Sequence, residues 1–338
     1  MGRLAEASHR EIGGMNTTHE PARLTLTDEQ DVAAVVPHLL GFHPSDSMVV
    51  IACRDRHIEF TARFDIGLCH DADLLHDAFG QLRQPKLHYL LVAFTADTEA
   101  AQDALAHVEI LLGARRVMLS AYTDGERVWR RGSSGSHRLR QHRPDLDRLA
   151  SDMGMQPLGS RDELAASIAG PPPERIEAVA LACAEALRRW RKRPLAARVV
   201  RTRELVEAGL ADATRLTEAE SAELGCLIDD VEVRDTVWLG MRRSRADAYI
   251  ALFRRVLTDT SGPLSAPALG LLGVAAWLAG RGPLTTACLE RGLGIDPEYR
   301  LFELLEETIC NAITPREYED VLRRIEASPT GAAVHAVG

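Results

Sequence analysis

The clearest pattern in the chain is HIEFTARFDI (57–66), in which apolar residues occupy every second position. Such alternation is typical of a β-strand with one face on a core. The preceding run SMVVIAC (47–53) is apolar on both faces, and a short turn around Asp55–Arg56 joins the two runs into a predicted hairpin. Because both faces of the first strand are apolar, we expect another layer to cover part of its second face.

Strand and helix patterns alternate along the N-terminal half. Thr27 is the expected N-cap of a helix that runs to about Leu40 and ends at Gly41. The other expected elements are a strand at 24–26, a helix at 71–82, a strand at 86–94, a helix at 98–112, and a hairpin of strands at 116–122 and 126–130. This order predicts an α/β domain over 22–170, with a mixed sheet, flanking helices and a flexible loop at 131–160.

The C-terminal half is expected to be entirely helical. The stiff segment AGPPPE (169–174) marks the predicted domain boundary, and 174–326 forms the all-α C-terminal domain. Residues 1–21 are expected to be a disordered extension, with translation starting at Met1 or Met15, and 327–338 a frayed tail. The nine expected helices are 174–192, 195–209, 217–229, 231–241, 245–258, 266–279, 283–293, 298–312 and 315–326.

Composition narrows the class of protein. Of 338 residues, 46% are hydrophobic and 26% charged, which is typical of a globular protein. The sequence shows no membrane-spanning stretch and no secretory signal, and its six cysteines form no CxxC pair. We therefore expect a cytoplasmic protein with reduced cysteines and no membrane partner. The net charge of −9 argues against nucleic-acid binding by the whole surface.

The hairpin carries a polar cluster of Asp46, Ser47, Arg63 and Asp65, with His43 nearby. A two-residue turn would place Asp46 opposite Asp65 and bring Arg63 within reach of both carboxylates. Such a cluster could bind a small anionic ligand, such as a phosphate or nucleotide, or form an acid–base pair. The competing interpretation, which base rates favour, is an inert cross-strand salt bridge.

Two segments are rich in arginine and contain no acid. Residues 127–143 hold six Arg and two His around Trp129, and residues 188–203 hold seven Arg and Lys192 around Trp190. Aromatic and cationic side chains together are typical of single-strand nucleic-acid binding. However, only two of the 40 basic residues are Lys, so coding composition also accounts for arginine clusters. The candidate contacts with a nucleic acid or acidic partner are Arg130, Arg131, Arg138, Arg140, Arg191 and Arg193.

The segment CHDADLLHDA (69–78) is the one candidate for a metal site. Asp73 and His76 would share a helix face, which makes ligation geometrically feasible. Acidic residues at a helix N-terminus explain the same pattern, and no second pair of ligands accompanies them. We therefore expect neither a metal nor a cofactor.

Three parts of the chain together resemble one known family: VVPHLLGFHPSDSMVVIA with FTARFDI, then GSRDELAASIAGP with VRDTVWLG (233–240), then PLSAPALGLLGVAAWLAGRGPLTTACLERGLGIDPEYRLFELLEE. The family is the actinobacterial domain of unknown function 4192 family. The resemblance covers most of 22–325 and implies a cytoplasmic protein of unassigned activity. It brings no catalytic residues with it.

The sequence lacks the common catalytic signatures for phosphate loops, hydrolase serines and zinc sites. This favours a non-catalytic binding or scaffolding module that acts through a protein partner. One alternative is a small-ligand sensor or enzyme that uses Asp46, Arg63 and Asp65 at the junction of the two domains. A second alternative is nucleic-acid binding through both arginine-rich segments, which requires the two to converge on one face.

Overall fold

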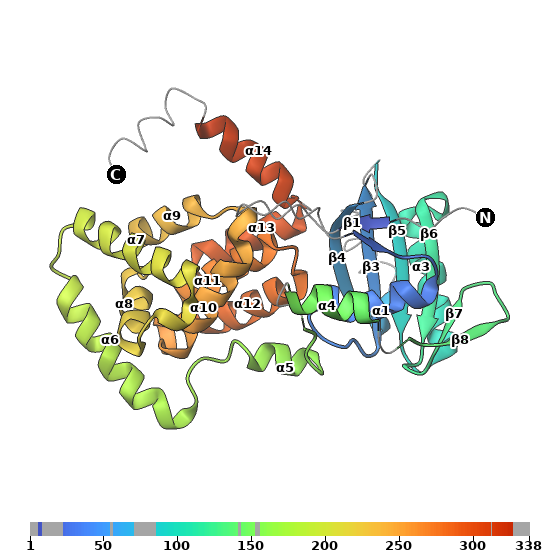
Figure 1. The fold of residues 1–338 in the computed structure, drawn as a ribbon, viewed down its shortest axis with the longest axis horizontal. Coiled ribbons are helices and arrows are strands. Elements are labelled where there is room, and N and C mark those ends of the chain that lie inside the picture. Colours follow the sequence, from blue (N-terminus) through green and yellow to red (C-terminus); the bar gives the residue numbers. More distant parts are fainter. Residues whose placement is uncertain are drawn as a thin grey trace. The chain divides into compact units, whose positions relative to one another are not determined.

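The computed structural model describes residues 6–8, 23–54, 57–70, 86–140, 143–152, 156–311 and 313–326. The chain divides into two compact units, each described by itself below (Figure 1). The sheet unit comprises 1–166 with 281–284, and the helical unit comprises 167–280 with 285–338. The predicted fold class, an α/β N-terminal part followed by an all-helical part, is confirmed.

The sheet unit contains a mixed sheet with the strand order β2-β1-β4-β3-β5-β6-β7-β8. Two neighbouring pairs, β1–β4 and β5–β6, are parallel, and the other pairs are antiparallel. The strands are β1 (Glu6–Ser8), β2 (Arg23–Thr25), β3 (Ser47–Arg54), β4 (His57–Asp65), β5 (His88–Phe94), β6 (Val117–Thr123), β7 (Arg127–Arg130) and β8 (Ser136–Arg138).

The predicted hairpin is present as β3 and β4, but its expected register is wrong over most of its length. Near the turn Arg54 pairs with His57, as a two-residue loop requires. The register then shifts between Ala52 and Cys53, so that Ser47 lies opposite Asp65 and Val49 opposite Arg63. An extra residue in one strand is a β-bulge, and it moves every later pairing by one position. The turn residues themselves lie outside the described part of the chain.

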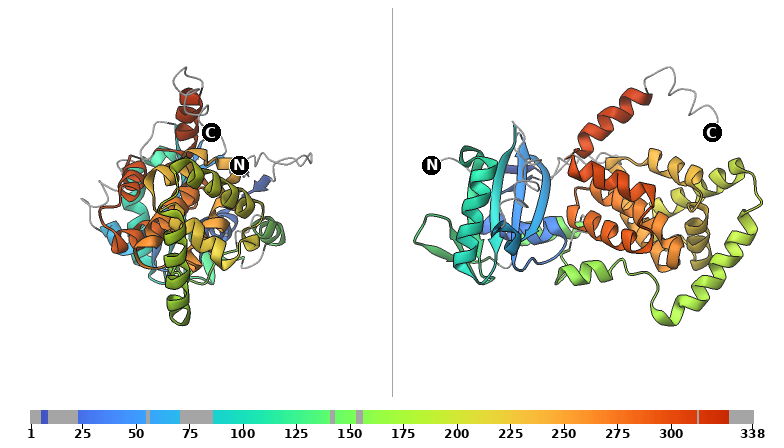
Figure 2. Two further views of the ribbon diagram at one scale, coloured as in Figure 1. Left: turned by 90° about the vertical axis from the view of Figure 1, so that its left-hand side faces the viewer. Right: turned by 180° about the vertical axis from the view of Figure 1, so that it is seen from behind.

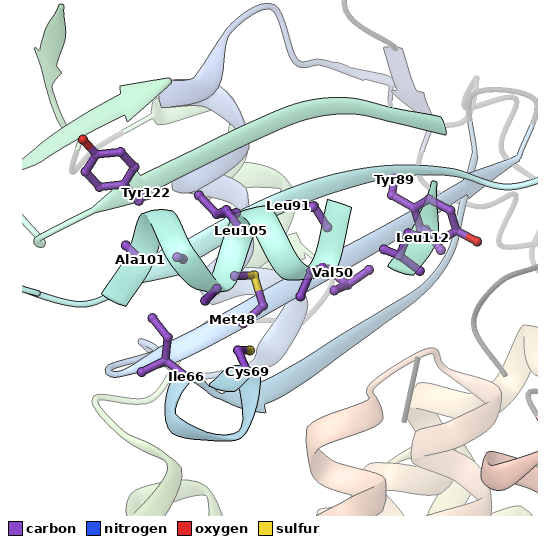
Figure 3. Close-up of a cluster of buried hydrophobic side chains, with 14 of the residues drawn as sticks. Met48, Val50, Ile66, Cys69, Tyr89, Leu91, Ala101, Leu105, Leu112 and Tyr122 are labelled. Carbon is purple, nitrogen blue, oxygen red and sulfur yellow. The ribbon is translucent and has the colours of Figure 1, made fainter. Parts of the chain in front are cut away.

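Helices cover both faces of the sheet. The helix α3 (Thr98–Leu112) has the predicted bounds and packs on the face that carries Met48 and Val50 (Figure 3). The helix α1 (Glu29–Leu40) packs against β4, β5, β6 and β7, and its Val36 is fully buried. Both faces of β3 are therefore buried, which explains why the strand is apolar on both sides.

The local signals around α1 are partly as predicted. Gly41 ends the helix in the left-handed conformation, with φ +80°. The N-cap is Asp28, not Thr27: the Asp28 carboxylate accepts the amide N–H of Asp31. The Thr27 hydroxyl and amide instead donate to the carboxylate of Asp31, at 2.7 and 2.9 Å.

The segment 131–160 was expected to be an irregular loop, and this is wrong for much of its length. It contains β8, paired with β7, and the helix α4 (Pro144–Asp152), and it is followed by α5 (Arg161–Ala166). The expected helix at 71–82 lies outside the described residues, as do the tail at 327–338 and most of 1–21. Within 1–21, the described residues 6–8 form β1, which pairs with β2 and β4.

All nine helices expected over 174–326 are present. Most begin with a Pro or an acidic first turn, so the signals that place them are local. They are α6 (Ile176–Trp190), α7 (Leu195–Ala211), α8 (Glu218–Leu227), α9 (Val231–Gly240), α10 (Ala246–Thr258), α11 (Ser265–Leu278), α12 (Gly282–Ile295), α13 (Arg300–Cys310) and α14 (Pro315–Glu326).

The helix α11 forms the centre of this unit, and α6 forms its edge. α11 is apolar all round, and nearly every one of its side chains is buried. α6 instead packs against α8 through a narrow stripe of small residues, and it lies along the outside of the helical unit (Figures 1 and 2). The stripe consists of Val179, Cys183, Ala186, Ala222 and Cys226.

The cysteines and the lengths of the helices add two observations. All six cysteines are free, five of them buried and Cys310 exposed. Burial raises the pKa of the Cys69 thiol to about 11 and that of Cys53 to about 12. Among the helices that the structure describes, none combines the length and the apolar character that crossing a membrane requires.

Candidate functional site

The polar cluster predicted on the hairpin centres on Ser47, which is completely buried at the start of β3. The Ser47 hydroxyl donates to the carbonyl of Ser45 at 2.6 Å and accepts the Nε–H of Arg63 at 2.8 Å. A second guanidinium nitrogen of Arg63 lies 2.5 Å from the Asp65 carboxylate. Ser47, Arg63 and Asp65 are therefore brought together on one face of the sheet.

Asp46 does not join this group, although the sequence predicted that it would. Its carboxylate accepts the Thr95 hydroxyl at 2.8 Å, and its carbonyl accepts the amide of Ile66 at 2.9 Å. Asp46 also has φ +42°, a conformation that aspartate tolerates better than most residues. The residue that sequence reasoning missed is Thr95, because it follows β5 and only the β3–β5 pairing brings it near.

The remaining member, His43, forms no hydrogen bond or ion pair with Arg63 in the described structure. Its side chain is exposed, and its backbone amide donates to the carbonyl of Leu158 at 2.9 Å. Asp65, whose side chain is 58% exposed, leaves the Arg63–Asp65 pair open to water. The geometry thus matches the competing interpretation, a cross-strand salt bridge in which the polar groups bind one another.

No metal site accompanies this cluster in the described residues, where no three His, Cys, Asp or Glu side chains gather to hold an ion. The candidate ligands Asp73 and His76 lie outside those residues.

The first arginine-rich segment, 127–143, is largely engaged with the N-terminus of α1. Asp31, only 3% exposed, lies 2.8 Å from Arg140 and 3.1 Å from Arg143. His137 approaches the Glu29 carboxylate at 3.5 Å. In the same segment Arg131 pairs with Glu109 of α3 at 2.5 Å. The three arginines offset acidic residues inside the sheet unit, so this part of the segment has a structural role.

The second arginine-rich segment, 188–203, divides into two parts. Three of its arginines face carboxylates: Arg189 and Arg201 contact Glu223, and Arg198 pairs with Asp230. The rest are exposed, and the described part of the chain offers them no ion pair. Four of these cluster where α6 ends and α7 begins, and we call them the basic turn: Arg188, Arg191, Lys192 and Arg193.

The candidate contact residues therefore fall into two classes. Arg131 and Arg140 are used in ion pairs. Arg130, Arg138, Arg191 and Arg193 are exposed and, within the described residues, without an ion pair. Arg188 and Lys192 were not among the named candidates, although the end of the predicted helix was the signal that could have identified them.

Both tryptophans are partly buried. Trp129 stacks on Tyr122, with ring centroids 5.1 Å apart and planes at 5°. Trp190 is half-buried, and its indole nitrogen is enclosed without a hydrogen-bond partner. What accompanies the basic turn is aliphatic: Leu181 is 66% exposed and Leu195 is 37% exposed.

Comparison with known proteins places the chain in one family. The model of the family described as "Domain of unknown function (DUF4192)" matches residues 30–316, so the chain belongs to this family. No curated protein and no solved structure matches the chain.

Proposed function

We propose that this member of the domain of unknown function 4192 family is a non-catalytic binding module, and that it binds an anionic partner through the basic turn. The observation that carries the proposal is the exposure of four cations with no ion pair in the described structure. An unpaired cluster of like charges repels itself, and an anionic surface relieves that repulsion. A charged patch of this kind accelerates and orients association more than it tightens the complex.

The helix dipole accounts for only part of the basic turn. Arg188 lies in the last turn of α6, where a cation offsets the negative end of the helix. This effect falls off within one turn, so it gives no reason for Arg193, which lies beyond the helix end. A binding role supplies that reason.

The polar cluster on the hairpin is a weaker candidate for a binding site than the basic turn, because its groups already bind one another. Ser47, Arg63 and Asp65 bond to one another, and Asp46 bonds to Thr95. A ligand at that cluster would first have to displace these partners. A cytoplasmic location is part of the proposal, supported by six cysteines that are all free.

The test measures binding of a fluorescent peptide of about twenty glutamates by anisotropy, at low and at physiological salt. The binding variant is R188Q/R191Q/K192Q/R193Q. The matched control, R115Q/R130Q/R138Q/R148Q, removes the same charge from four cations of the sheet unit that are also exposed and, in the described residues, without an ion pair.

Exposed ion pairs contribute about 0.2–1 kcal/mol each, so we expect the binding variant to weaken the complex roughly thirtyfold at low salt. The control should change affinity less than about twofold, and added salt should weaken the wild-type complex. Equal losses in both variants would show that the affinity follows net charge alone, and the proposal would then be abandoned.

A further inference from the structure

Two exposed aliphatic side chains, Leu181 and Leu195, flank the basic turn along the chain, and they bear on what kind of anion it binds. Leu181 and Arg188 are seven residues apart on α6, so they share one face of the helix. Leu195 begins α7, directly after Arg193 and Pro194. The four cations are thus bounded by an exposed leucine on each side along the chain.

These leucines are exposed for a structural reason. α6 packs on α8 through Val179, Cys183 and Ala186, with Ala182 and Leu187 partly buried beside them. Leu181 lies on another side of the helix and is 66% exposed. A large aliphatic side chain that the fold leaves in water gains free energy when a partner covers it.

Nucleic acid fits these neighbours poorly. Single-strand binding uses phosphate contacts together with aromatic rings on which bases stack. Trp190 is the only aromatic residue in 188–203, and it is half-buried with its indole nitrogen enclosed. Leucine offers a base no stacking surface, but it packs well against the aliphatic side chains of a polypeptide.

We infer that the partner of the basic turn is an acidic polypeptide segment that carries aliphatic side chains, such as an amphipathic helix. Its carboxylates pair with the four cations, and its apolar side chains cover Leu181 and Leu195. This inference rests on the proposed function and narrows it to one class of partner. Amphipathic helices are recognised in this way when an apolar stripe and a charged rim coincide.

Three labelled probes of equal charge separate the possibilities. The first is an acidic helical peptide with leucines at i, i+4 and i+7, and the second is the same peptide with serines at those positions. The third is an oligothymidine. Each is titrated against the wild-type protein, L181S/L195S and the matched control I110S/L239S, in which the exposed Ile110 of α3 and Leu239 of α9 are changed.

Wild-type protein should bind the leucine peptide about tenfold more tightly than the serine peptide, and the oligothymidine most weakly. L181S/L195S should reduce the tenfold preference to less than about twofold, with the serine peptide unaffected, and I110S/L239S should preserve it. Equal binding of the two peptides would overturn the inference and leave the proposed function standing. Tightest binding of the oligothymidine would replace the polypeptide by nucleic acid. Failure of all three probes to bind would remove the proposed function as well.

Discussion

The two arginine-rich segments have similar compositions and very different surroundings. In 127–143, Arg140 and Arg143 converge on the buried Asp31, and Arg131 pairs with Glu109. In 188–203, the four cations of the basic turn are exposed and form no ion pair in the described structure, although Glu185 lies on the same helix and pairs with Arg189. Composition alone does not distinguish the two cases. The location of the acidic residues does, because a cation that is already paired has little to offer a partner.

The difference follows from what surrounds each segment. The acids that meet 127–143 come from helices packed on the sheet, and so they are held close by the core. The basic turn instead joins α6, at the edge of its unit (Figure 1), to α7, and its four cations are exposed. One segment therefore contributes to stability, and we expect the other to contribute to binding.

The largest effect should come from removing the buried acid that the first segment surrounds. Asp31→Asn leaves Arg143, whose side chain is 13% exposed, without its buried partner. Breaking such a pair typically costs about 3–5 kcal/mol. We expect the free energy of opening of α1 to fall by an amount near the lower end of this range. Hydrogen exchange of the α1 amides measures it locally, which is needed because the two units need not unfold together.

The matched control for that experiment is Asp145→Asn. Asp145 pairs with the same arginine, but its side chain is 56% exposed, and so its loss should cost less than about 1 kcal/mol. If both variants were equally destabilised, burial would not be what makes Asp31 important.

A smaller effect is expected from the paired part of the second segment. Glu223, 5% exposed, lies 2.7 Å from Arg201 and 3.5 Å from Arg189. In Glu223→Gln both arginines are exposed enough to be rehydrated. We therefore expect the free energy of opening, measured by hydrogen exchange of the α8 amides, to fall by about 1–2 kcal/mol. Glu185→Gln, which removes an exposed partner of Arg189, should change stability by less than about 0.5 kcal/mol.

Most elements of both units could be predicted from sequence because their signals are local, but β1, β8 and α4 were not among them. Gly41 ends α1, the apolar period marks β4, and the bounds of α3 and α14 were predicted to the residue. The bulge between Ala52 and Cys53 was not predictable in this way, because it arises from how β4 pairs with β3. That single shift is why Arg63 contacts Ser47 instead of Asp46.

The role of an arginine was the least predictable property. Arg140 and Arg143 lie more than one hundred residues from Asp31 along the chain, and only the packing of α1 on the sheet brings them together. Likewise, the exposure of Leu181 depends on which stripe of α6 meets α8. The local pattern of apolar and polar residues does not predict such contacts between distant segments.

The first segment should also show a small dependence on acid. The Arg143 guanidinium donates to Asp145 and lowers the pKa of that carboxyl below its usual 3.8. Its ionised form therefore stabilises the fold above pH 3.8, and this contribution disappears as the pH falls through the lower, folded pKa. Because Asp145 is more than half exposed, the effect should be a few tenths of a kcal/mol. The free energies of unfolding of wild type and Asp145→Asn should converge as the pH falls. A difference between them that grows towards low pH would contradict this assignment.

The smallest effect on stability is expected at the basic turn itself. In R188Q/R191Q/K192Q/R193Q no ion pair of the described structure is broken, and the relief of repulsion among the four charges opposes the lost interaction of Arg188 with the α6 dipole. We expect the free energy of opening, measured by hydrogen exchange of the α6 amides, to change by less than about 0.5 kcal/mol. A loss above about 2 kcal/mol would show that these cations support the fold, as Arg143 does, and the contrast between the two segments would disappear. A variant that loses binding while the α6 amides stay protected would instead establish that the same residue type stabilises one segment and recognises a partner in the other.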